Sequence, residues 1–220
     1  MKRMNAKRKR ILIAVLVVAL ALSLSIGSAL AYYNSVTEEK SNVFTSAENI
    51  RAKLIEPNWD AQEGLKLVPG KTVPKDPMVV NTGEIDEYVA IRLTFLDASG
   101  NPLPDAKLEK LLSLVDITWN SQWKADPAQP MLFYYQSILS PGQTSDPLFS
   151  SIRCHDESDG LTEEELRWLQ GIKIVDGIIV PDSDGIGYFS IKVEGAAIQA
   201  FGLADAAAAE SELAALFPAI

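Results

Sequence analysis

Few residues in this chain are suited to catalysis, because it contains one histidine, His155, and one cysteine, Cys154. A zinc protease needs two histidines and a third ligand, typically arranged as H-E-x-x-H on one face of a helix. A serine hydrolase would also have to use His155, and no nucleophile-elbow motif lies near it. Neighbouring side chains on an extended chain point to opposite faces, so adjacency alone does not make Cys154 and His155 a catalytic pair. We therefore expect no catalytic residues and no cofactor.

Two acidic segments, 155–160 and 182–185, offer oxygen ligands of the kind that calcium prefers. An EF-hand loop also needs a bidentate Glu at its twelfth position. Aligning the glycine of either segment with the invariant glycine of such a loop puts Leu166 or Ile191 at that position. We therefore interpret both segments as ordinary Asp-Gly turns and predict no metal site.

Six aromatic side chains are candidates for a carbohydrate-binding platform. Their spacing does not distinguish such a platform from a hydrophobic core. Trp119 lies in an alternating segment and Trp168 in a short amphipathic one, so we expect both to be buried in the core. The six residues are Trp59, Trp119, Trp123, Tyr134, Tyr135 and Trp168.

The stretch 76–95 organises the predicted fold, because it has the pattern of a strand, a tight turn and a second strand. Met78–Val80 is a short apolar run followed by Asn81-Thr82-Gly83, a sequence typical of tight turns, so we predict a β-hairpin here. From Tyr88 onward the side chains alternate between two faces, which indicates a half-buried strand of an antiparallel sheet. The residues expected on its buried face are Val89, Ile91, Leu93 and Phe95.

Strand and turn signals recur along the rest of the chain. Residues 47–55 alternate and predict the first strand, Thr162 begins a capping box that predicts a short helix, and Asp176-Gly177 is typical of a hairpin turn. About eight short strands separated by turns favour a sandwich or jelly roll. We therefore predict a mostly β chain: a jelly-roll-like antiparallel β-sandwich with short helical insertions and a C-terminal helix.

Residues 1–31 have the three parts of a signal peptide. Six Lys and Arg residues without an acidic residue come first, an uninterrupted apolar run follows over 11–22, and small residues then lead to the cleavage motif. Ala29 and Ala31 form this A-x-A motif, which predicts Tyr32 as the first residue of the mature chain. We therefore expect export.

The predicted organisation has four parts: a signal peptide at 1–31, a polar leader at 32–45, a β-sandwich domain at 46–202 and an alanine-rich C-terminal helix or tail at 203–220. The alternative for the first part is an uncleaved membrane anchor, because 11–33 is just long enough to span a bilayer.

The charge of the chain is unevenly distributed. The net charge is −9, and without the six N-terminal cations the chain has 14 Lys and Arg against 29 Asp and Glu, a net charge of −15. An acidic body of this kind repels nucleic acid and anionic lipid, which excludes a DNA- or RNA-binding protein. A single cysteine also excludes an internal disulfide.

Several short segments resemble the TasA/camelysin family of exported Gram-positive proteins, which are cognates of an ER-type (SipW-type) signal peptidase. The matching segments follow the family's order along most of the chain. They are Gly27–Asn34, Asn42–Thr45, Pro69-Gly70, Asn81-Thr82-Gly83, Tyr88-Val89, Tyr134-Tyr135, Leu139–Gly142, Pro147-Leu148-Phe149 and Ala197–Gly202.

This resemblance implies a jelly-roll β-sandwich, secretion, and deposition at the cell surface or in the biofilm matrix. In TasA-like proteins the mature N-terminal segment inserts as a strand into the next subunit and builds a filament. Carried onto this chain, the candidate donor strand is 32–45, and its apolar residues are Tyr32, Tyr33, Val36, Val43 and Phe44. Its charged residues, Glu38, Glu39 and Lys40, depart from the family pattern.

The functional expectation is a secreted, non-enzymatic structural protein that assembles with itself or with a homologous matrix subunit. Its other expected partner is the ER-type signal peptidase, and it meets the membrane only through the signal peptide before cleavage. The alternatives are a monomeric surface adhesin or ligand-binding module, and a camelysin-type metalloprotease.

Overall fold

Strands dominate the computed structural model, which describes residues 40–42, 50–60 and 68–217. Of the described residues, 37% are in strands and 18% in helices. The described residues all belong to one compact unit. The mostly β character and the β-sandwich predicted from the sequence are confirmed.

The described residues form twelve strands and three α-helices, with one short 3₁₀ turn. The strands are β1 (Lys40–Asn42), β2 (Ala52–Ile55), β3 (Thr72–Pro74), β4 (Met78–Asn81), β5 (Glu87–Leu96), β6 (Val115–Trp119), β7 (Trp123–Ala125), β8 (Leu132–Tyr135), β9 (Phe149–Cys154), β10 (Ile172–Val175), β11 (Ile178–Pro181) and β12 (Ser190–Gln199). The helices are α3 (Asp105–Ser113), α4 (Glu163–Leu169) and α5 (Ala206–Ala215), and the 3₁₀ turn is η1 (Glu157–Asp159).

The largest sheet has five strands in the order β1-β12-β5-β8-β7. Its centre is the antiparallel pair β5 and β12, which stay in register over ten residues, from Ser190 opposite Leu96 to Gln199 opposite Glu87. Two smaller sheets, β3-β9-β6 and β2-β4, contribute to the same hydrophobic core. The core therefore lies between the five-stranded sheet and these two sheets.

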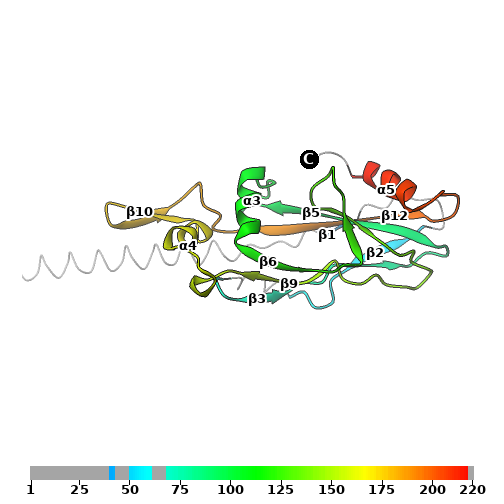
Figure 1. Cartoon of the computed structure of the whole chain (residues 1–220), viewed down its shortest axis with the longest axis horizontal. Helices are drawn as coiled ribbons and strands as arrows, with labels where there is room; N and C mark the ends of the chain where they lie inside the picture. Colours follow the sequence, from blue (N-terminus) through cyan, green and yellow to red (C-terminus); the bar gives the residue numbers. More distant parts are fainter. Residues whose placement is uncertain (1–39, 43–49, 61–67, 218–220) are drawn as a thin grey trace, which may run out of the picture. The chain divides into compact units, whose positions relative to one another are not determined.

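The predicted alternation of β5 is confirmed, because Val89, Ile91, Leu93 and Phe95 all lie in this core. The other face of the strand was expected to be exposed, and it is buried as well. Ala90 packs there in a second apolar cluster together with Leu213 and Phe217 from the region of α5. The C-terminal helix thus covers the outer face of the sheet (Figure 1).

The hairpin predicted over 76–95 does not form. β4 pairs with β2 and β5 pairs with β12 and β8, so the intervening turn crosses from one sheet to another. The buried side chain of Asn81 holds this crossover: Nδ2 donates to the carbonyl oxygens of Ile85 (2.7 Å) and Leu139 (2.8 Å). Its Oδ1 accepts a hydrogen bond from the Gly83 amide at 2.8 Å. Asn81 therefore joins two sheets instead of closing a hairpin.

The capping box predicted at Thr162 is present and begins α4. The Thr162 amide donates to the Glu165 carboxylate at 2.8 Å, and the Glu165 amide donates to Thr162 Oγ1 at 3.2 Å. The hairpin predicted at Asp176-Gly177 is also present, and it joins β10 to β11. Both turn residues have positive φ, 51° and 78°, as a tight type I′ turn requires.

Candidate functional site

The outer edge of β12 is the first candidate for a functional surface, because β1 occupies it. β1 runs parallel to β12, with Lys40 opposite Val193 and Asn42 opposite Gly195. The residues of β1 belong to the candidate donor segment 32–45. The other residues predicted for cleavage and donation lie outside the described residues; they are Ala29, Ala31, Tyr32, Tyr33, Val36, Val43 and Phe44.

β12 packs against the core with one face and pairs with β5 along one edge, and β1 lies along its other edge. Val193 and Ala197 are buried in the core, and β5 pairs with the full length of β12. A Cβ built at Gly195 would lie 3.7 Å from Leu54 Cδ1, an ordinary van der Waals distance. β1 itself pairs over only three residues, and parallel pairing is slightly less stable per residue than antiparallel pairing. The edge is therefore filled by a short and weakly paired strand.

A buried ion pair joins β12 to β5 on the face that α5 covers. Arg92 and Glu194 are direct cross-strand neighbours, and Glu194 Oε2 accepts from Arg92 Nε at 3.0 Å and from Nη2 at 2.8 Å. The other carboxylate oxygen lies 3.3 Å from Lys192 Nζ. The centre of the Phe217 ring lies 5.0 Å from the guanidinium carbon of Arg92. This arrangement links the register of β12 to the docking of α5.

Cys154 and His155 have different surroundings. Cys154 is buried in the core, and burial raises the pKa of its thiol to about 11, which keeps it protonated near neutral pH. His155 Nε2 instead lies 3.0 Å from Asp116 Oδ1. This hydrogen bond is the main reason that the pKa of Asp116 is lowered. His155 and Asp116 thus form a polar contact between β6 and the residue that follows β9.

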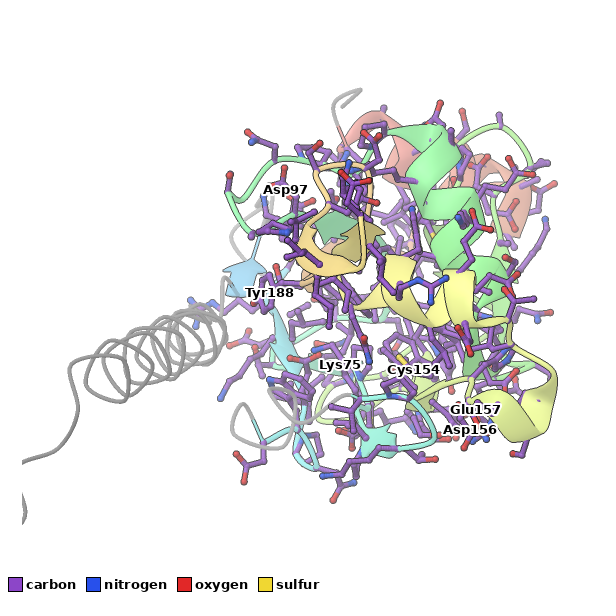
Figure 2. The ribbon with its side chains drawn as sticks, turned by 90° about the vertical axis from the view of Figure 1, so that its left-hand side faces the viewer. Lys75, Asp97, Cys154, Asp156, Glu157 and Tyr188 are labelled. Atoms are coloured by element: carbon purple, nitrogen blue, oxygen red, sulfur yellow. The ribbon has the colours of Figure 1, made fainter. Side chains whose placement is uncertain are left out.

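The acidic loop after His155 turns its carboxylates toward its own backbone and toward Arg153. Arg153 Nη2 donates to Asp159 Oδ2 at 2.8 Å, which lowers the pKa of Asp159 to about 2. Asp156 accepts from the Ser158 amide at 2.9 Å and so caps η1. Figure 2 shows Asp156 and Glu157 at the periphery of the domain. The carboxylates of Asp156 and Asp159 are thus hydrogen-bonded within the turn and to Arg153.

The second acidic loop is held by two lysines. Lys173 Nζ lies 3.0 Å from Asp182 Oδ1, and Lys107 Nζ donates to the carbonyl oxygens of Ser183 (2.9 Å) and Gly185 (3.3 Å). These contacts fix the loop at the base of the β10–β11 hairpin.

Across residues 40–42, 50–60 and 68–217, no three His, Cys, Asp or Glu side chains come close enough together to hold a metal ion.

The tryptophans differ in their surroundings. Trp168 is buried, as predicted, and Trp123 is buried too. The prediction is wrong for Trp119, which is 42% exposed because it lies on the edge strand β6, at the end of the strand. One face of its indole stacks on Phe133 with a centroid distance of 4.9 Å. Trp119 is thus an exposed aromatic side chain at the end of the edge strand β6.

Sequence reasoning missed two features of functional interest. It predicted neither the pairing of Lys40–Asn42 with β12 nor the exposure of the apolar side chains on the β10–β11 hairpin. The run of isoleucine and valine over 172–180 was the available signal for the second feature.

No protein-family model matches the chain, and no curated protein matches it in sequence. Within the described ranges, none of the helices has the length and apolar character needed to cross a bilayer.

Proposed function

We propose that this chain is a secreted, non-enzymatic structural protein of the cell surface or biofilm matrix, which assembles by exchange of its N-terminal strand. The observation that carries the proposal is the position of β1 at the outer edge of β12. An edge strand can be replaced by the same segment of another copy, because the main-chain hydrogen bonds would be the same. The signal-peptide pattern of 1–31 and the resemblance to TasA-like proteins support export and assembly.

The length of β1 favours exchange over permanent intramolecular pairing. Three parallel residue pairs hold it to β12, whereas ten antiparallel pairs hold β5 on the other side. Because fewer residue pairs hold β1 than hold β5, we expect β1 to separate from β12 more readily than β5 does. The proposed partner is a second copy or a homologous matrix subunit, after an ER-type signal peptidase has removed residues 1–31.

Electron microscopy of two purified chains tests the proposal. One begins at Tyr32, and the other begins at Ser46 and therefore lacks the candidate donor segment. We expect filaments from the first chain and no filaments from the second. A synthetic peptide with the sequence 32–45 should bind the shorter chain, and a scrambled peptide of the same composition should not. Filaments from both chains, or equal binding of both peptides, would contradict strand exchange.

A second candidate function is a monomeric adhesin, and the exposure of Trp119 favours it. An indole with one face stacked on Phe133 can present its other face to a sugar ring. Quenching or a shift of tryptophan fluorescence by a glycan, lost in Trp119→Ala and kept in Phe201→Ala, would support this alternative. Phe201 is a suitable control because it is 87% exposed on a different turn.

A further inference from the structure

The β10–β11 hairpin exposes an unusual amount of branched aliphatic surface. The exposed fractions are 52% for Ile174, 47% for Val175, 65% for Ile178 and 66% for Ile179. The hairpin extends from the end of the domain at which β12 begins, away from α5 (Figure 1). Single exposed apolar residues are common on protein surfaces, but four on one short hairpin favour an interaction site.

Both faces of the hairpin are apolar. Ile174 pairs with Ile179 and Val175 pairs with Ile178, and residues directly opposite each other share a face of the sheet. Successive residues alternate between faces, so each pair lies on a different side of the hairpin. Within the part of the chain that the structure describes, β10 and β11 pair only with each other, which leaves both outer edges open.

The base of the β10–β11 hairpin is closely packed, so the exposed aliphatic side chains lie on a fixed element. Gly171 has φ +64°, and a Cβ there would lie 2.7 Å from the Cα of Gly187. A Cβ at Gly185 would lie 2.8 Å from the Cα of Gly171. The ion pair between Lys173 and Asp182 spans the same region at 3.0 Å. The hairpin is therefore a preformed projection.

A lipid bilayer is a poor occupant for this surface. Two open edges would carry unpaired backbone N–H and C=O groups into hydrocarbon, where no water can satisfy them. The only basic side chain between residues 172 and 181 is Lys173, which is already paired with Asp182. The hairpin thus lacks the cationic rim that would attract anionic headgroups. A protein strand, by contrast, satisfies an open edge.

We propose that the hairpin binds the hairpin of a second copy of this chain, with the two β10 strands pairing antiparallel about a two-fold axis. Charge favours this contact, because the chain is strongly acidic while residues 172–181 carry one Lys and one Asp and are neutral. Two acidic copies repel each other least where they meet at a neutral patch. β10 is the pairing edge, because β11 ends at Pro181, which has no N–H to donate.

The two-fold axis passes next to Ile174. A pairing centred on Lys173 would place two lysines directly opposite each other, which is destabilising. A pairing centred on Ile174 places the two isoleucines opposite each other and Lys173 opposite Val175 of the second copy. This contact does not involve β12 and does not depend on strand exchange, so it can succeed or fail independently of the proposed function.

Cysteine cross-linking of the chain that begins at Tyr32 tests the contact. Opposed Cα atoms in an antiparallel pair lie about 4.5–5.5 Å apart, within the range that a disulfide spans. Ile174→Cys should therefore form a disulfide-linked dimer under mild oxidation, because residue 174 meets its own copy. The native Cys154 is buried and does not interfere.

Ile178→Cys is the matched control, because Ile178 is more exposed than Ile174 but lies on β11, away from the axis. Random collisions would cross-link residue 178 at least as fast as residue 174, and this result would overturn the proposal. Sedimentation velocity gives a second measurement: Ile174→Lys should shift a concentration-dependent dimer to monomer. Binding of the chain to phosphatidylcholine vesicles, without dimers in solution, would also overturn it. The chain that begins at Ser46 should cross-link as the longer one does.

Discussion

The buried ion pair between Arg92 and Glu194 provides the sharpest test of how the sheet and α5 fit together. The side chains are only 9% and 6% exposed, so water screens their interaction little. Glu194→Gln keeps the shape of the side chain but removes its negative charge. Arg92 then remains buried beside a neutral amide, under the ring of Phe217. We expect a substantial loss of stability.

Breaking a buried ion pair by removing one partner costs roughly 3–5 kcal/mol. Glutamine can still accept one hydrogen bond, so we expect a loss of about 3 kcal/mol in the free energy of unfolding, at the lower end of that range. For a domain of this size, such a loss lowers the Tm by roughly 6–12 °C.

The control is the same substitution at an exposed ion pair. Glu163 Oε2 lies 3.0 Å from Arg167 Nη1, and the Glu163 side chain is 84% exposed. Glu163→Gln should cost less than about 1 kcal/mol. Urea denaturation of the two variants and the unsubstituted chain measures both losses. Equal, small losses would refute the reasoning, because they would mean that α5 does not shield Arg92 and Glu194 from water.

Three further predictions follow from buried or constrained groups. Burial raises the pKa of Glu87, whose Oε2 has no hydrogen-bond partner among the described residues, so the folded chain binds its proton more tightly than the unfolded chain. The contribution of protonated Glu87 to the free energy of unfolding is therefore present at pH below about 4.5 and is lost as the pH rises through the raised pKa. In urea titrations from about pH 4 to 7, Glu87→Gln should remove this pH dependence of the free energy of unfolding. Cys154 should resist a thiol reagent at about pH 8 until urea unfolds the chain, and rapid labelling of the folded chain would contradict its burial. In thermal denaturation, Gly171→Ala should lower the Tm of the chain more than Gly100→Ala does. Both glycines have positive φ, which costs roughly 1–2 kcal/mol for alanine, but only the Cβ at residue 171 would lie against the backbone of Gly187.

Local patterns in the sequence were sufficient for several elements. The alternation from Tyr88 placed Val89, Ile91 and their partners on the correct face of β5, because side-chain direction in a strand depends only on the period of two. The capping box at Thr162 and the turn at Asp176-Gly177 also formed as predicted. These features involve residues within a few positions of each other, so the sequence alone carries the information.

Pairing over long distances could not be predicted in this way. The turn after Asn81 has the composition of a hairpin, but the Asn81 side chain bonds to Leu139, far along the chain, and β4 and β5 enter different sheets. The outer face of β5 was expected to meet water, and α5 covers it. Trp119 was expected in the core, and its place at the end of an edge strand leaves it exposed.

The sequence by itself determined the acidic charge and the presence of one histidine and one cysteine, and it was sufficient to predict the mostly β character. Only the tertiary structure decided which strands are neighbours, that Lys40–Asn42 lies beside β12, and that the aliphatic side chains of β10 and β11 are exposed. The physical reason is that a strand has the same alternating pattern whichever partner it pairs with. Its neighbours, and therefore its exposed faces and edges, depend on which distant segments pack together to bury the most apolar surface.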